Sequence, residues 1–276
     1  GKKGSHPKEE RGCAKWGRTE WLGKIYPLKT KEKDFLDQYV KHYNSIELNA
    51  THYKIYGETG IGKWAAKAGN KDFMFCPKMY QGVTHRGSLL NKDFVTNEFL
   101  RGIVAFKEHL GPVFVQLSDA FSPKRKEEVF TFLRSLPTDM QFFLEVRHPD
   151  WFAKTEIRDE LMEILREINM GIVITDTAGR RDCAHMYLTV PKTFIRFVGN
   201  SLHETDFTRV DDWISRMKQW LDKGIEELYF FMHMHDEATS TELTVYLVDK
   251  MNKELGLNLI KPKFIDDDGK QKDLFD

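Results

Sequence analysis

The sequence predicts an α/β protein folded as a single TIM-like (β/α)8 barrel. Eight short strand-like segments recur at intervals of roughly 20 to 40 residues, and helical periodicity fills most of the gaps between them. The chain has 276 residues, of which 41% are hydrophobic and 13% aromatic, so it can bury one large core. An open doubly wound sheet is the main alternative, but no glycine-rich phosphate turn follows the first strand.

The predicted strands are mostly β-branched or aromatic runs without polar alternation, which is typical of strands covered on both faces. They span residues 12–16, 44–49, 72–78, 112–117, 141–147, 170–175, 193–198 and 227–233. We therefore predict a barrel domain over residues 12–264, with a polar tail at residues 1–11 and a charged tail at residues 265–276.

Four apolar stripes with a spacing of three or four residues predict helices between the strands. The stripes run over residues 36–43, 99–110, 157–168 and 207–221. The sixth crossover departs from this pattern, because residues 177–192 have poor helical periodicity and contain a proline. We expect the barrel to be irregular there.

Several helix ends carry signals of their own. Ser122 and Pro123 predict an N-cap followed by proline in the first helical turn. Gly111, Gly171 and Gly224 each follow a predicted helix, at a place where a residue in the left-handed conformation commonly ends the helix.

Charge and cysteine content argue against several classes of protein. Lysine and arginine number 42 together, and aspartate and glutamate also number 42, so the formal net charge at pH 7 is zero. A neutral chain argues against a protein that coats nucleic acid or binds a membrane surface. No apolar stretch has the length of a transmembrane helix. The three cysteines, Cys13, Cys76 and Cys183, are scattered, which suits a reducing compartment and predicts a cytoplasmic protein. No pattern in the sequence indicates an oligomeric state.

The fifth predicted strand ends in an unusual group of ionisable residues. Alternation places Phe142 and Leu144 on one face of this strand, and Glu145 and Arg147 on the other. Burying a carboxylate and a guanidinium on a core strand is costly unless the charges are paired or used. This segment is therefore the first candidate for a functional site.

The same alternation in the other strands predicts a polar layer facing the barrel axis. Most of these residues lie in the last positions of their strands, the end at which barrel enzymes assemble their active sites. The residues that we expect there are Glu47, Asn49, Lys78, Gln116, Glu145, Arg147 and Arg196, with Asp176 at the end of the sixth strand.

The charges of this layer predict a pocket for a small anionic or phosphorylated molecule. Lys78, Arg147 and Arg196 supply three cations against Glu47 and Glu145, and arginine matches the geometry of carboxylate and phosphate. We expect the three cations to hold the anion.

Other residues would complete a catalytic site. Glu145 between arginines should stay ionised and act as a general base or an orienting group, while His85 or His148 would shuttle protons. Asp176 is a further catalytic candidate, and Tyr53 a further substrate-binding candidate.

Three alternatives to this enzyme remain open. The charged residues could form a buried ionic layer without chemistry, because buried pairs can simply hold register. A metal-dependent hydrolase or lyase is the second, since His233 and His235 have a spacing that places two imidazoles on one strand face. A non-catalytic metabolite-binding protein is the third. The remaining histidines are interpreted as surface or helix positions: His6, His42, His52, His109 and His203.

Several motifs occur in order along the chain. They are Gly12-Cys-Ala-Lys-Trp16, Tyr26-Pro27, Ile46-Glu-Leu-Asn-Ala-Thr-His-Tyr53, Phe73-Met-Phe-Cys-Pro-Lys78, Thr84-His85, Glu145-Val-Arg-His148 and Arg196-Phe-Val-Gly199. Through these motifs the chain resembles the YecE-like family, catalogued as domain of unknown function 72, from about Gly12 to Met251.

The resemblance implies a TIM-like barrel but brings no established reaction. A comparison with xylose-isomerase-like and endonuclease-IV-like metalloenzymes is an analogy of fold alone. In the eighth strand the chain differs from the usual family pattern, because His233 and His235 stand where family members more often show asparagines. The resemblance marks as matching positions Glu47, Asn49, Thr51, Tyr53, Lys78, His85, Gln116, Glu145, Arg147, His148, Asp176 and Arg196.

Overall fold

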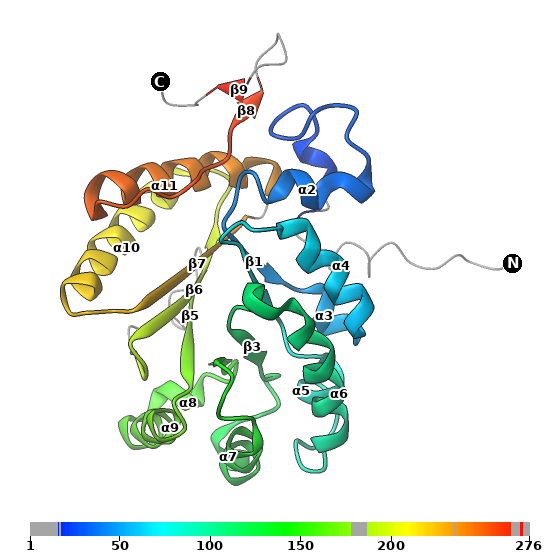
Figure 1. Ribbon diagram of the computed structural model, residues 1–276. Helices are drawn as coiled ribbons and strands as arrows, with labels where there is room; N and C mark the ends of the chain where they lie inside the picture. The colour runs from blue at the N-terminus through cyan, green and yellow to red at the C-terminus, as the bar shows by residue number, and fades with distance from the viewer. Residues whose placement is uncertain (1–15, 17, 178–186, 235, 266–270, 273–276) are drawn as a thin grey trace, which may run out of the picture. The chain divides into compact units, whose positions relative to one another are not determined.

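The computed structural model describes residues 16, 18–177, 187–234, 236–265 and 271–272 (Figure 1). The chain divides into two compact units. Of the described residues, the first unit comprises Trp16 and residues 45–172, and the second comprises those within 18–44 and 173–272.

The first unit contains a series of short parallel strands in sequence order. β1 (Ser45–Leu48) pairs with β2 (Met74–Pro77), and β3 (Val113–Gln116) pairs with β4 (Phe142–Glu145). An isolated parallel bridge between Lys78 and Phe114 links the end of β2 to β3. β4 pairs in turn with the first residues of β5 (Gly171–Thr177). Parallel pairing brings the carboxyl ends of β2, β3 and β4 to the same edge.

Helices and 3-10 turns connect these strands. The longer ones carry an apolar face that packs into the core, as the predicted stripes require. Ser122 caps its turn as predicted, because its hydroxyl accepts a hydrogen bond from the backbone N–H of Lys124. The elements are α3 (Ala50–Tyr53), α4 (Glu58–Ala68), α5 (Gln81–Thr84), α6 (Asp93–Ile103), η3 (Val104–His109), η4 (Pro123–Arg125), α7 (Lys126–Ser135), α8 (Asp150–Ala153) and α9 (Thr155–Glu167).

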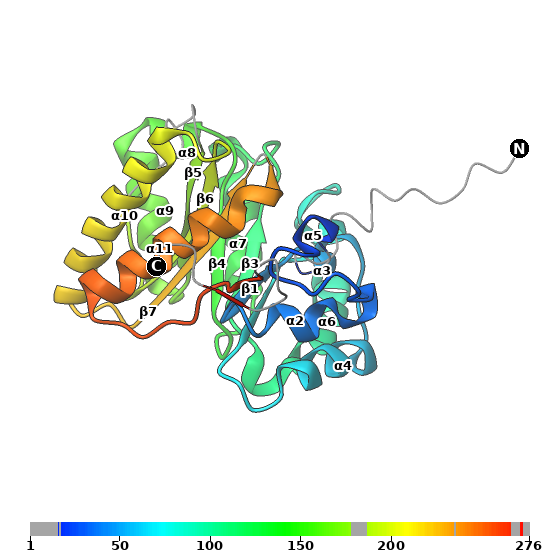
Figure 2. The same ribbon diagram turned by 90° about the horizontal axis from the view of Figure 1, so that it is seen from above.

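The second unit holds the end of β5, β6 (Lys192–Gly199) and β7 (Glu227–Met234), which pair in parallel. α10 (Glu204–Asp222) and α11 (Ser240–Leu255) lie side by side against these strands (Figures 1 and 2). Their apolar faces bury a core with the strand residues Ile195 and Phe197. The smaller elements are η1 (Thr19–Trp21), η2 (Glu32–Asp34), α2 (Phe35–Tyr39), η6 (Glu237–Thr239), β8 (Phe264–Ile265) and β9 (Gln271–Lys272).

An α/β fold with parallel strands is confirmed, and seven of the eight predicted strands are present as β1 to β7. Hydrogen bonds order five of them as β3-β4-β5-β6-β7. The first predicted strand, residues 12–16, lies outside the described residues except for Trp16. The complete eight-stranded barrel therefore stays a prediction, and most of the sixth crossover, residues 178–186, also lies outside the described part.

The structure corrects two of the three glycine predictions. Gly224 has a φ of 89° and ends its helix in the left-handed region, as expected. Gly111 and Gly171 do not have a positive φ. Gly171 is needed for space, because a Cβ there would lie 2.2 Å from the Phe143 ring. Asn169, with a φ of 56°, is the left-handed residue after α9.

Candidate functional site

Glu145 and Gln116 form the centre of the candidate site in the first unit. They are direct neighbours in the register of β3 and β4, and both are buried. The Gln116 side-chain amide donates a hydrogen bond to Glu145 Oε2. The Glu145 carbonyl also accepts the backbone N–H of Leu117 at 3.0 Å. A buried carboxylate is thus held at the last position of a core strand with an amide donor beside it.

Arg147 lies at the open side of this pair. Its Nη1 is 3.8 Å from Glu145 Oε2, an attractive distance that is too long for a hydrogen bond. The Arg147 side chain is 52% exposed, and within the described residues the guanidinium makes no hydrogen bond. Arg147 therefore partly balances the buried carboxylate while most of its donors face solvent.

Lys78 places a second cation on the same face of the strands. Its ammonium lies 5.5 Å from the centre of the Phe114 ring, and Phe114 shares a strand face with Gln116. The Lys78 backbone is fixed from both sides. Its N–H donates to Leu48 O at 3.0 Å, and its carbonyl accepts the Thr51 hydroxyl at 2.8 Å.

Two histidines pack together beside these groups. The rings of His52 and His85 meet edge to face with their centres 4.9 Å apart. His52 Nδ1 lies 2.7 Å from Met79 O and must donate to it, which leaves Nε2 as an acceptor. His85 Nδ1 lies 2.6 Å from the Thr84 hydroxyl. His85 is exposed and His52 is buried.

The pKa of His52 is lowered to about 4, and burial is the largest cause. The Lys78 ammonium lowers it further, whereas the hydrogen bond to Met79 O opposes the change. His52 is therefore neutral at neutral pH.

The pKa of His85 is also lowered, first because its neighbours remove part of the residue from water and then by the charges of Lys78 and Arg147. Asp119 and Glu145 act in the opposite direction. The ends of β2, β3 and β4 thus carry one electrostatic cluster, in which cations and a buried carboxylate act on the same imidazole.

Four other predicted residues of the first unit have different environments. Glu47 is buried on β1, Asn49 is half-buried ahead of α3, and Tyr53 is 44% exposed at the end of α3. His148 is half-buried, and its Nδ1 accepts the backbone N–H of Asp150 at 3.2 Å. That contact places the His148 ring at the start of α8.

Asp176, in the second unit, lies on the helix side of its strand. Its carboxylate accepts the Trp213 indole N–H at 2.8 Å and pairs with Arg209 at 3.0 Å, and it is fully buried. β5 runs to Thr177, so alternation keeps Asp176 on the face of Ile174. The structure thus places Asp176 in a buried ion pair with α10.

Arg196 occupies the opposite face of its sheet. Its neighbours in β6, Ile195 and Phe197, both point into the core under α10, so Arg196 points the other way. His233 shares that face by its register with Val198. The role of Arg196 in holding an anion stays a prediction, and His235 lies outside the described residues.

The interpretation of the remaining histidines as surface or helix positions is wrong at His42, which is buried in a turn. His52 and His109 do lie in helical elements, α3 and η3, where both are buried. The signal that could have revealed His52 is its place directly after a buried strand, next to Thr51. Among the described residues, no group of three or more histidine, cysteine, aspartate or glutamate side chains could hold a metal ion.

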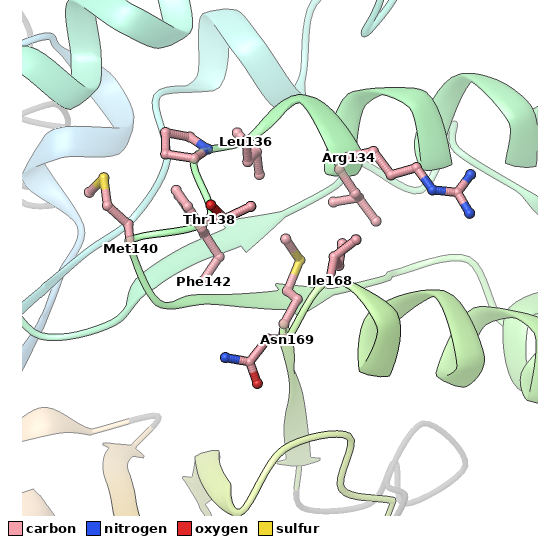
Figure 3. A pocket seen from close by; sticks show the side chains of 10 residues that line it. Arg134, Leu136, Thr138, Met140, Phe142, Ile168 and Asn169 are labelled. Atoms are coloured by element: carbon pink, nitrogen blue, oxygen red, sulfur yellow. The ribbon is translucent and has the colours of Figure 1, made fainter.

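A small pocket lies at the opposite end of β4 (Figure 3). It is lined mainly by apolar side chains such as Leu136, Met140 and Ile168, and the Arg134 guanidinium points away from it. Its volume of about 20 Å³ is enough for roughly one water molecule. This pocket is too small for a metabolite, and Phe142 in its lining begins the strand that Glu145 ends.

The sequence pattern of a known family covers nearly all of the described chain. The family model with the description "Protein of unknown function DUF72" matches residues 10–264. The chain belongs to this family. The predicted membership is thereby confirmed.

Two curated proteins named UPF0759 are similar in sequence to this chain. The UPF0759 protein YecE of Escherichia coli (strain K12) is 29% identical over 238 residues, covering 80% of this chain and 86% of that protein. The UPF0759 protein YunF of Bacillus subtilis (strain 168) is 28% identical over 149 residues, or 51% of each chain.

Solved structures of family members support the fold. A DUF72 family protein from Enterococcus faecalis V583 superimposes with a TM-score of 0.68 at 17% identity, covering 92% of this chain and 98% of that one. A DUF72 family protein from Thermotoga maritima MSB8 superimposes with a TM-score of 0.63 at 20% identity, covering 89% of this chain and 98% of that one. In the part of the chain that the structure describes, no helix is long and apolar enough to span a membrane.

Proposed function

We propose that the carboxyl ends of β2, β3 and β4 bind a small anionic molecule, including phosphorylated ones, and that the protein is an enzyme acting on it. The observation that carries this proposal is the position of Arg147. Its half-exposed guanidinium stands beside the buried Glu145 but at 3.8 Å, so its donors are available to a ligand.

The charge balance supports the same ligand class. Lys78 and Arg147 both act electrostatically on His85, and so does Glu145. An anion that enters between the two cations would replace water as the partner of the exposed guanidinium donors. The fixed carboxylate would then orient Arg147 from the other side, which reduces the rotamer entropy lost on binding.

The histidine and the carboxylate supply acid–base chemistry. A lowered pKa keeps His85 neutral near pH 7 in the empty site, so it can take up a proton when a substrate binds or reacts. Glu145 would serve as general base or as the group that orients Arg147. This set is suited to a hydrolase or a lyase, because both reactions move a proton near a developing negative charge.

A crystal soaked in sulfate or phosphate tests the binding site. We expect an anion within hydrogen-bond distance of Arg147 or Lys78. Crystals of Arg147→Ala should lose the anion, whereas crystals of Arg101→Ala, a substitution at a surface arginine paired with Glu98, should keep it. Density for the anion elsewhere only, or in both variants equally, would overturn the proposal.

Catalysis and simple binding are separated by a second experiment. A screen of phosphorylated and carboxylated metabolites identifies a substrate by turnover, and the double variant Glu145→Gln with His85→Gln is then compared with the wild type. Loss of turnover with retained binding supports the enzyme. Binding without turnover by the wild type, for every anion that binds, would favour a non-catalytic binding protein.

A further inference from the structure

We propose that anion binding at this site is coupled to the uptake of one proton by His85. The inference rests on the proposed function, because it concerns the same cluster of charges. It goes further by making the affinity for the anion depend on pH even when the anion itself does not titrate.

The position of His85 allows this coupling. It follows α5 directly, its Nδ1 lies 2.6 Å from the Thr84 hydroxyl, and its exposed ring can exchange protons with water. A hydroxyl can donate to a neutral ring nitrogen or accept from a protonated one. Thr84 can therefore stay hydrogen-bonded to His85 in both protonation states.

The charges that face His85 come from several elements. Lys78 and Arg147 follow β2 and β4, Asp119 follows β3, and Glu145 ends β4. The two cations disfavour the imidazolium form in the empty site. An anion bound to Lys78 and Arg147 compensates their field, so the protonated ring becomes more favourable once the ligand is present.

Linkage then makes the effect reciprocal. If the ligand favours protonation of His85, protonation of His85 must favour the ligand by the same factor. The affinity therefore rises as the pH falls through the interval between the pKa of His85 in the empty site and its pKa in the complex. The lowered pKa of His85 leaves the ring unprotonated near neutral pH, ready to take up a proton.

His85 is a better proton acceptor than His52, although the two rings are in contact. His52 is buried, and its Nδ1–H is already donated to Met79 O. Its pKa of about 4 lies well below neutral pH. Protonation of both adjacent rings would place two like charges 4.9 Å apart, measured between ring centres, so at most one proton is expected for the pair.

Calorimetric titration with sulfate tests the proposal, since sulfate has no proton to gain or lose near neutral pH. Titrations at about pH 6.5, near the ordinary histidine pKa, in buffers of different ionisation enthalpy give the number of protons taken up. We expect a measurable uptake of part of one proton in the wild type, because the ring is protonated to a larger extent in the complex than in the empty site. The affinity should rise by up to about tenfold for each unit of acidification.

Two variants make the result specific. His85→Gln should still bind sulfate, with no proton uptake and a flat pH profile of affinity. His203→Gln, a substitution at an exposed histidine that caps α10, should behave as the wild type.

The possible failures are distinct. Sulfate binding by the wild type without proton uptake would overturn the coupling and leave the proposed function intact. Proton uptake that persists in His85→Gln would also overturn the coupling, because the proton would then go to another group. Failure of sulfate to bind at all would count against the proposed function itself and remove the coupling with it.

Discussion

Gln116 donates its side-chain amide to the buried carboxylate of Glu145, its direct neighbour in the parallel register of β3 and β4. This contact ties together the two strands that end at the candidate site. It also gives the carboxylate a neutral donor in addition to the distant Arg147.

Replacing Gln116 by leucine should destabilise the protein by about 1–3 kcal/mol, because the buried carboxylate of Glu145 loses its amide donor. Urea unfolding followed by circular dichroism measures the change. Gln219→Leu, at an exposed helix position, should alter stability by less than about 0.5 kcal/mol. Equal effects of the two substitutions would contradict the role given to Gln116.

Arg209→Leu should be among the most destabilising single changes in the second unit. The substitution removes the Arg209 guanidinium from the fully buried Asp176 carboxylate, and breaking a buried pair in this way typically costs about 3–5 kcal/mol. Arg134→Ala breaks the exposed pair with Glu167 and should cost no more than about 1 kcal/mol. Thermal unfolding of both variants checks the difference, and a mild effect of Arg209→Leu would refute the structural role of Asp176.

Acidification should destabilise the second unit through His42. Burial lowers the pKa of His42 from 6.5 to about 4, and its Nδ1 accepts the backbone N–H of Lys263 at 3.0 Å. The unfolded chain binds a proton at this histidine below about pH 6.5, whereas the folded chain resists it, so stability is lost as the pH falls from about 6.5 to 4.

The loss attributable to His42 is on the order of 3 kcal/mol, and it is complete only below about pH 4. His42→Asn keeps an acceptor for Lys263 and removes the titration. Its unfolding free energy, measured between pH 7 and pH 5, should fall less steeply than that of the wild type. If the unfolding free energies of the wild type and of His42→Asn fall in parallel with pH, another group is responsible for the loss of stability in acid.

Gly171→Ala should destabilise the first unit by about 1–3 kcal/mol through overpacking, since its Cβ would lie 2.2 Å from the ring of Phe143. Gly62→Ala is the matched control, because it lies inside α4 with no atom within 4 Å of the new Cβ. That substitution should stabilise the protein by about 0.4–1 kcal/mol. The unfolding midpoints of the two variants measure both effects. A change in stability of the same sign in both variants would be inconsistent with the packing described.

Strand positions and the face of Glu145 could be predicted because both depend on local pattern. The period of two along a strand puts Gln116 and Glu145 on one face once the register of β3 and β4 is given. Helix caps such as Ser122 also follow from a few neighbouring residues.

The sequence-based predictions fail where tertiary packing determines the surroundings of a residue. β5 extends two residues past the predicted end at Thr175, so Asp176 continues the helix-facing row and meets Trp213 and Arg209. No local pattern specifies that partnership between a strand and a later helix. His52 was missed for a similar reason, because its burial depends on a carbonyl 27 residues later in the chain, that of Met79.

The affinity of Arg147→Ala for sulfate tests the central claim most directly. Calorimetric titration at one pH and ionic strength compares it with the wild type and with the surface control Arg101→Ala. Loss of a charge-assisted contact of about 1.5–3 kcal/mol predicts a roughly ten- to hundredfold weaker affinity for Arg147→Ala and no change for Arg101→Ala. Wild-type affinity in Arg147→Ala would contradict an anion site at the ends of β2, β3 and β4.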